Sequence, residues 1–252
     1  MSTARDPWQR RVIVALDVDS LAEARRLVRR LAPHVACFKV GKQLFVGAGP
    51  EVVRLVRRHG REVFLDLKFH DIPNTVAAAV VEAARLGVRF VDLHASGGAP
   101  MMRAATEALA AVCRAERLHR PALLAVTVLT SMDAADLRAV GVQATPPAQV
   151  RRLARLAVAA GVDGVVASPR EAAMLRRAFG RPLVIVCPGV RPAGATAGDQ
   201  KRVRTPGEAV AAGADYVVVG RPVLHAADPA AAVRAIAADM RRAARARRRP
   251  AR

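Results

Sequence analysis

Eight short apolar runs, each followed by a segment with helical periodicity, constrain the fold of this 252-residue chain more than any other feature. The runs have the length of strands and are apolar almost throughout, which is typical of parallel strands that are buried on both faces. They cover residues 12–17, 35–40, a third run that begins at 63, 88–94, 122–129, 163–168, 183–187 and 216–219. This alternation predicts an α/β protein in which a parallel sheet closes into a (β/α)8 TIM barrel.

An open, doubly wound sheet is the alternative fold, but no G-x-G-x-x-G follows an early strand of this chain. An apolar fraction of 52% with 25% charged residues is typical of a globular protein. No composition shift marks a domain boundary inside the chain. We therefore expect a single barrel domain over residues 11–240, an N-terminal arm over 1–10 and a basic C-terminal tail over 241–252, with the last helix covering 229–242.

The expected cellular location follows from the lack of a membrane-spanning run, of a signal-peptide pattern and of paired cysteines in the sequence. No apolar run is long enough to span a membrane, and the N-terminus has no signal-peptide pattern. Three cysteines are scattered along the chain without the spacing of metal ligands. An odd number of isolated cysteines argues against disulfides, so we expect a cytoplasmic protein with no membrane partner.

The formal charge of +20 raises a second possibility, which is nucleic-acid binding. The excess is mostly arginine, spread over the expected helix surfaces and concentrated in residues 241–252. Aromatic side chains make up only 3% of the chain and are not interleaved with the basic residues as base-stacking surfaces require. We therefore expect no specific nucleic-acid partner.

The third apolar run ends in a cluster of charges. Asp66 and Lys68 are two residues apart, so their side chains point to the same face of a strand. Asp71 follows in the turn, and Pro73 suits the first position of the next helix. A salt-bridged strand end would explain the motif structurally, whereas an active site would use these charges to activate or repel a bound group.

Polar residues at the ends of the other runs favour the active site. Because the C-terminal ends of the strands meet on one face of a TIM barrel, and that face carries the active site, these residues are expected to lie together. They are Asp17, Lys39, His94, Thr130, Ser131, Ser168, Pro188, Gly220 and Arg221. His70 and His94 lack the spacing of metal ligands, so a structural role is favoured for both and no metal site is predicted.

A phosphate site is expected after the last strand. Gly220 and Arg221 stand where TIM barrels commonly bind phosphate through backbone N–H groups, and an arginine matches phosphate geometry. The preceding segment 191–204 is long, polar and rich in glycine. It is interpreted as a lid over the site, with an ordinary surface loop as the alternative.

Taken in order, these motifs resemble the bacterial orotidine 5′-phosphate decarboxylases from about residue 12 to about residue 235. The ordered set is far more specific than any single motif. The resemblance is carried by residues 14–17 (VALD), 38–41 (FKVG), 64–75, 94–98 (HASGG), 129–132 (LTSM), 188–192 (PGVRP), 198–202 (GDQKR) and 219–222 (VGRP).

The resemblance implies decarboxylation of orotidine 5′-monophosphate to UMP without a metal or other cofactor. It implies that Lys68 protonates C6 as CO2 leaves, that Asp66 and Asp71 flank the scissile carboxylate, and that Lys39 completes the charge network. It also implies a homodimer, in which Asp71 and Thr75 reach the neighbouring subunit's site. The other implied contacts are Asp17 and Lys39 with the ribose, Thr130 or Ser131 with the pyrimidine, Pro188 in the same site, and Arg191, Gln200, Gly220 and Arg221 with the phosphate.

Sugar-phosphate decarboxylases and hexulose-phosphate synthases are the closest rival, because they share an Asp-x-Lys-x-x-Asp motif on the same barrel. These relatives use magnesium and have a glutamate at the position of Lys39. The sequence Lys39-Val40-Gly41 and the Gly198-Asp199-Gln200 segment argue against them.

Overall fold

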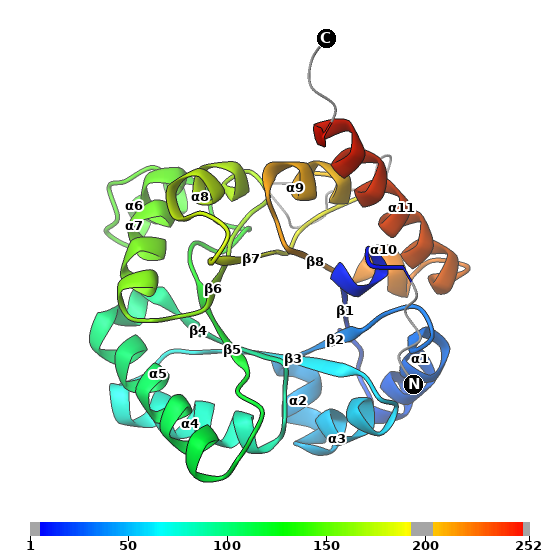
Figure 1. The fold of residues 1–252 in the computed structure, drawn as a ribbon, viewed down its shortest axis with the longest axis horizontal. Coiled ribbons are helices and arrows are strands. Elements are labelled where there is room, and N and C mark those ends of the chain that lie inside the picture. Colours follow the sequence, from blue (N-terminus) through cyan, green and yellow to red (C-terminus); the bar gives the residue numbers. More distant parts are fainter. Residues whose placement is uncertain (1–5, 193–203, 249–252) are drawn as a thin grey trace.

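The computed structural model describes residues 6–192 and 204–248, which form a closed barrel of eight parallel strands. The strands pair in chain order, and β1 closes the barrel against β8 (Figure 1). This confirms the predicted TIM barrel. The strands are β1 (Val12–Ala15), β2 (Cys37–Gly41), β3 (Glu62–Phe69), β4 (Phe90–His94), β5 (Ala122–Val126), β6 (Gly164–Val166), β7 (Val184–Cys187) and β8 (Tyr216–Val219).

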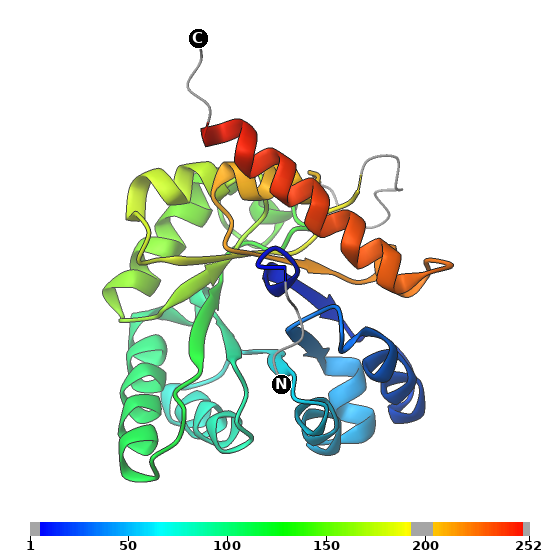
Figure 2. The same cartoon turned by 45° about the vertical axis from the view of Figure 1, so that its right-hand side comes forward.

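Helices surround the barrel on its outside (Figures 1 and 2). The longer ones are α1 (Leu21–Leu31), α3 (Glu51–Arg58), α4 (Pro73–Arg85), α5 (Gly98–Ala115), α7 (Pro146–Ala159), α8 (Ala172–Phe179) and α11 (Pro229–Arg248). The shorter ones are η1 (Gln9–Arg11), α2 (Lys42–Ala48), η2 (Ala95–Gly97), α6 (Ala134–Ala139), α9 (Pro206–Ala212) and α10 (Arg221–Leu224). Within the described ranges, no helix is long and apolar enough to cross a membrane.

The period of two along each strand separates two apolar layers. On β3, for example, Val63 and Leu65 face the helices, whereas Phe64 faces the barrel interior. Side chains from the other strands join Phe64 inside the barrel and are buried there: Ile13, Ala15, Cys37, Phe90, Leu124, Val126, Val166, Val186 and Val218. Along a strand, the next inward-facing side chain stands two residues further on. After the last core residue, that side chain lies at the C-terminal end of the barrel.

Two short helices were not expected, and two helix boundaries differ from those expected. The seven-residue α2 and the four-residue α10 were not predicted, because both are too short to show a hydrophobic period. Helix α8 begins at Ala172, three residues after Pro169, because residues 169–171 form turns.

At the C-terminus, α11 continues to Arg248 rather than ending near 242. The segment beyond 240 is rich in alanine and arginine, which have high helix propensity, so the helix continues into the basic segment. In Figure 2, α11 lies across the outside of the barrel and its last turns reach the edge of the molecule.

Candidate active site

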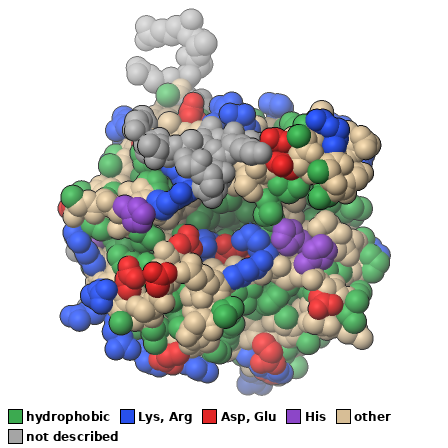
Figure 3. All heavy atoms as spheres, turned by 180° about the vertical axis from the view of Figure 1, so that it is seen from behind, with side chains coloured by type: hydrophobic (Ala, Val, Ile, Leu, Met, Phe, Trp, Pro, Cys, Tyr) green, Lys and Arg blue, Asp and Glu red, His purple; other side chains and the backbone are tan. Residues whose placement is uncertain are grey.

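A cavity of about 240 Å³ opens at the C-terminal ends of the strands. Figure 3 shows acidic and basic side chains gathered in the hollow at the centre of this face. Among the residues that line the cavity are six that were predicted from the sequence: Lys39, Asp66, Lys68, Thr130, Ser131 and Pro188. The structure therefore brings these six side chains together at the C-terminal ends of the strands.

Four charged side chains form a continuous chain of ion pairs beside and within this cavity. The Nζ of Lys39 lies 3.1 Å from Oδ1 of Asp17 and 3.1 Å from Oδ2 of Asp66. The other carboxylate oxygen of Asp66, Oδ1, accepts a hydrogen bond from Nζ of Lys68. Charges therefore alternate in sign from Asp17 through Lys39 and Asp66 to Lys68.

Burial and neighbouring charges act in opposite directions on the central pair. Burial alone would raise the pKa of Asp66, but the charge of Lys39, the neighbouring Asp92 carboxyl and the charge of Lys68 lower it well below its usual range. Burial alone would lower the pKa of Lys39, but Asp66 and Asp17 raise it. Both side chains are therefore ionised at neutral pH, in a site that is largely shielded from water.

Asp92 is the member of this cluster that the sequence reasoning missed. It is fully buried on β4, and its Oδ1 accepts a hydrogen bond of 2.8 Å from the backbone N–H of Lys68. Its Oδ2 is buried without a hydrogen-bond partner among the described residues. Burial, followed by the negative charge of Asp66, raises the pKa of Asp92 well above its usual value. Burial and the charge of Asp66 thus favour the neutral form of Asp92, whereas the neighbours of Asp66 favour its ionised form.

The apolar part of the cavity was also missed. Apolar side chains from β3, β5, β6 and β8, and from the segments just after β5 and β6, form a wall of the cavity, which suits a flat ring better than a charged group. They are Phe64, Val126, Val128, Leu129, Val166, Ala167 and Val218. The signal was present in the sequence, because these positions continue the inward-facing alternation of their strands or follow it directly.

Two histidines lie at the edge of the site. The rings of His70 and His94 are 5.4 Å apart between centroids. Burial, followed by the charges of His70, Lys68 and Lys42, lowers the pKa of His94 to about 4. In the described part of the chain, no group of three His, Cys, Asp or Glu side chains is arranged to hold a metal ion.

The remaining predicted residues differ in how close they lie to the cavity. Asp17 does not line the cavity but forms an ion pair with Lys39, which does. Gly220 is next to Asp17, since a Cβ added to Gly220 would lie 3.3 Å from Oδ2 of Asp17. Arg221 is exposed and begins α10. Arg191 is buried, and its Nη1 donates a hydrogen bond of 2.9 Å to the carbonyl oxygen of Val190.

Asp71 and Thr75 do not line the cavity of this subunit. Both are exposed, one just before α4 and the other in its first turn. The Oδ1 of Asp71 accepts a hydrogen bond of 2.6 Å from the backbone N–H of Ile72. Gln200 lies outside the described residues, as does most of the proposed lid, 193–203.

Comparison with known proteins identifies the family. The sequence profile described as "Orotidine 5'-phosphate decarboxylase / HUMPS family" matches residues 10–236. The chain belongs to this family. A family member from Syntrophotalea carbinolica, named orotidine 5′-phosphate decarboxylase, is 55% identical over 232 residues, which are 92% of this chain and 95% of that protein.

Two further family members extend the comparison. The orotidine 5′-phosphate decarboxylase of Moorella thermoacetica is 53% identical over 231 residues, covering 91% of this chain and 92% of its own. The crystal structure of orotidine 5′-phosphate decarboxylase from Lactobacillus acidophilus matches with a TM-score of 0.79 at 38% identity. That match covers 92% of this chain and 99% of the other. Relatives named orotidine 5′-phosphate decarboxylase thus match the present chain over nearly its whole length.

Proposed function

We propose that this enzyme converts orotidine 5′-monophosphate to UMP and CO2, the last step in the synthesis of UMP. The observation that carries the proposal is the ion-paired chain of Asp17, Lys39, Asp66 and Lys68 beside an apolar wall. A pyrimidine ring fits the apolar wall, and the charges are placed at its edge. The names of the relatives that match most of the chain support the same reaction.

Lys68 is the proposed proton donor to C6 of the pyrimidine. Loss of CO2 leaves an electron pair at C6, and no neighbouring carbonyl group can delocalise it. An ammonium group held at that carbon stabilises the developing charge and then transfers its proton there. The bond between Nζ of Lys68 and Asp66 supports this role, because it holds the ammonium group inside the cavity.

Asp66 and Asp71 are proposed to flank the carboxylate that leaves. Asp66 is ionised at neutral pH, so it repels a second carboxylate placed beside it. That repulsion raises the energy of the bound substrate and is relieved when neutral CO2 departs. Binding of the phosphate at the far end of the substrate offsets the repulsion.

The reaction is proposed to need no metal. Lys39 supports this, because its ammonium group lies between the carboxylates of Asp17 and Asp66, the position in which a cation would balance them. The rival members of the family are sugar-phosphate enzymes that resemble this chain in the Asp-x-Lys-x-x-Asp motif and use magnesium. A lysine at position 39 repels a divalent cation at those carboxylates.

The rest of the substrate is assigned to residues around the same cavity. Asp17 and Lys39 are proposed to bind the ribose hydroxyls, and Thr130 or Ser131 the pyrimidine, with Pro188 beside them. The phosphate is assigned to Arg191, Gln200, Arg221 and the backbone N–H of Gly220.

A homodimer is proposed because Asp71 and Thr75 are exposed outside the cavity of their own subunit. The neighbouring Ile72 is 66% exposed, which suits a position that a second subunit covers. Asp71 and Thr75 would then complete the partner's site. A cytoplasmic location stays a prediction; the three cysteines are buried and free, which suits a reducing compartment.

A spectrophotometric assay in excess EDTA tests the reaction and its independence from metal. The purified enzyme is expected to consume orotidine 5′-monophosphate and to form UMP. Lys68→Ala is expected to lose at least about 10⁴-fold in kcat, because it removes both the proton and the charge at C6. Lys42→Ala is the matched control, because Lys42 is exposed at the start of α2 and does not line the cavity.

Two results would contradict the proposal. An enzyme that leaves the substrate intact in EDTA but converts a sugar phosphate when magnesium is added belongs to the rival group. If Lys68→Ala turned over at the wild-type rate, Lys68 could not be the proton donor, although the family assignment would stand.

A further inference from the structure

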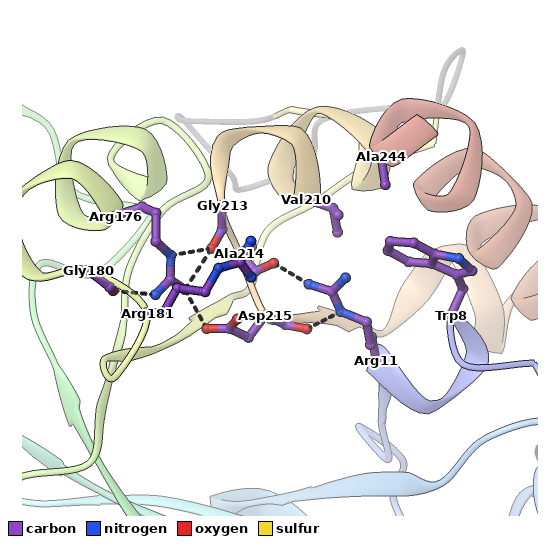
Figure 4. A pocket seen from close by; sticks show the side chains of 10 residues that line it. All are labelled: Trp8, Arg11, Arg176, Gly180, Arg181, Val210, Gly213, Ala214, Asp215 and Ala244. Carbon is purple, nitrogen blue, oxygen red and sulfur yellow. Dashed lines mark hydrogen bonds and ion pairs between the residues drawn. The ribbon is translucent and has the colours of Figure 1, made fainter. Parts of the chain in front are cut away.

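A second cavity, of about 420 Å³, lies at the opposite end of the barrel and is larger than the active-site cavity. Figure 4 shows that its walls come from Trp8 and η1, from the end of α8 and the residues after it, from α9 and the segment that joins it to β8, and from α11. Three of these segments, η1 and those after α8 and α9, lead into β1, β7 and β8, so the cavity is at the N-terminal ends of the strands. Its lining residues are Trp8, Arg11, Arg176, Gly180, Arg181, Val210, Gly213, Ala214, Asp215 and Ala244.

The charged groups in this lining do not balance. The guanidinium groups of Arg11, Arg176 and Arg181 face a single carboxylate, that of Asp215, which leaves an excess of two positive charges. The Oδ2 of Asp215 is already bonded, since it accepts 2.6 Å from Nη2 of Arg176 and 2.8 Å from the backbone N–H of Ile185. Arg176 and Asp215 therefore satisfy each other.

The other two arginines have no carboxylate partner in the described residues. Arg11 donates from Nε to the carbonyl oxygen of Asp215 at 2.7 Å and from Nη2 to that of Ala214 at 2.6 Å (Figure 4). Both acceptors are neutral carbonyl groups. Arg181 is exposed and makes no hydrogen bond or ion pair with any described residue. Arg11 and Arg181 account for the two excess charges.

The electrostatics of Arg11 agree with this imbalance. Its pKa is lowered mainly by burial; Asp215 and Tyr216 oppose the shift, while the charges of Arg181 and Arg176 add to it. Holding these guanidinium groups together costs free energy, and a bound anion would reduce that cost.

The position of Arg11 is also fixed. Its Cζ lies 4.8 Å from the centroid of the Trp8 ring, within cation–π distance. The two carbonyl bonds and the indole together restrict the side chain, so little conformational entropy is lost when it binds a ligand. Val210 and Ala244 add apolar surface to the cavity.

We propose that this cavity is a second ligand site, for a small phosphate-bearing anion, separate from the active site. A phosphate group carries close to two negative charges at neutral pH, which matches the excess charge of the lining. Guanidinium groups bind phosphate oxygens through paired N–H donors. The cavity volume falls within the range of small-molecule sites, about 300–1,000 Å³. Inorganic polyphosphate and nucleoside triphosphates both offer this chemistry.

Trp8 is the only tryptophan of the chain and lines the cavity, so its fluorescence reports binding there directly. The full chain is titrated with sodium tripolyphosphate and, separately, with ATP, at constant ionic strength. A saturable change with either probe is expected. A midpoint about tenfold lower for ATP assigns the site to nucleotides, because the base then adds affinity, whereas equal midpoints assign it to the phosphates alone.

Arg181→Ala is expected to raise the midpoint about tenfold or more, because it removes one of the two excess charges. This exposed side chain can be removed without leaving a cavity in the core, and circular dichroism checks the fold. Arg103→Ala, another exposed arginine without a described partner, is the matched control and should leave the midpoint unchanged.

Arg221→Ala separates the two sites, because Arg221 is assigned to the phosphate of the active site. A midpoint that shifts in Arg221→Ala but not in Arg181→Ala would place the bound anion in the active site and overturn the proposal. The absence of a saturable change with both probes would overturn it as well.

Discussion

The backbone N–H of Lys68 donates a hydrogen bond of 2.8 Å to Oδ1 of the buried Asp92. Lys68 has a φ of 52°, in the left-handed region that non-glycine residues rarely adopt, and the pairing of β3 with β4 is irregular between Leu65 and Phe69. A residue in this region costs about 1–3 kcal/mol and persists only where its surroundings hold it. Asp92 is the side chain that holds this peptide, so it positions the ammonium group of Lys68 relative to Asp66.

We expect Asp92→Ala to lower kcat about 10- to 100-fold while changing KM less than about threefold, because a displaced Lys68 affects the chemical step more than binding. Asp92→Asn is the matched control. Its side-chain oxygen can accept the same bond from the backbone N–H of Lys68, so kcat should stay within about tenfold of wild type. Steady-state kinetics measures kcat and KM of both variants, and a thermal melt checks that both are folded. Asn and Ala variants with equal losses would exclude this positioning role.

Protonation of His94 gives a stability prediction. Its pKa is lowered from 6.5 to about 4 in the folded protein, so the unfolded chain binds more protons between these values. His94 therefore does not lower the free energy of unfolding above pH 6.5, and it lowers that free energy progressively as the pH falls towards 4. Because His94 is only partly buried, we expect a loss of about 1–2 kcal/mol rather than the full value of the shift.

His94→Gln should make the free energy of unfolding less dependent on pH by this amount over the same interval. Urea unfolding at several pH values from 4 to 7 measures it. His225→Gln, which changes an exposed histidine after α10, is the control and should keep the wild-type dependence. An unchanged slope in His94→Gln would show that another group causes the acid sensitivity.

Gly164 on β6 gives a prediction about packing. A Cβ at this position would lie 2.5 Å from the carbonyl oxygen of Val184 and 2.7 Å from its Cβ, and backbone on the neighbouring strand β7 cannot move away cheaply. We expect Gly164→Ala to destabilise the protein by about 1–3 kcal/mol through overpacking. Gly47→Ala is the matched control, since a Cβ in α2 meets nothing within 4 Å and should add about 0.5–1 kcal/mol of stability. Urea midpoints that change equally in both variants would contradict the packing argument.

The barrel could be predicted because its signal is repeated and local. The run at 216–219, for example, coincides with β8 (Tyr216–Val219). Helices α2 and α10 could not be predicted in the same way, because elements of seven and four residues are shorter than the window in which a helical period can be recognised.

The active site could be predicted to the extent that its residues stand at strand ends. Lys39, Asp66 and Lys68 are polar residues that follow apolar ones, so their position in a barrel implies that they meet. Asp92 lies within the apolar run 88–94. Its positioning role depends on a hydrogen bond with the backbone of another strand. That contact arises from the irregular backbone at Lys68, which no residue pattern revealed.

Asp71 poses a different problem, because its proposed role requires a second subunit. If Asp71 completes the partner's site, each site combines Lys68 of one subunit with Asp71 of the other. Lys68→Ala and Asp71→Ala are each expected to be nearly inactive. A dimer that contains one subunit of each variant then has one site with both defects and one site with none.

Mixing the two inactive variants under conditions that exchange subunits should therefore restore activity. Random exchange places half of the chains in mixed dimers, and half of the sites in those dimers are intact, so about a quarter of the wild-type activity is expected. Size-exclusion chromatography of the mixture checks that dimers are present, and each variant treated alone is the control. If Asp71 acts within its own subunit, every site in a mixed dimer carries one defect, and mixing restores nothing.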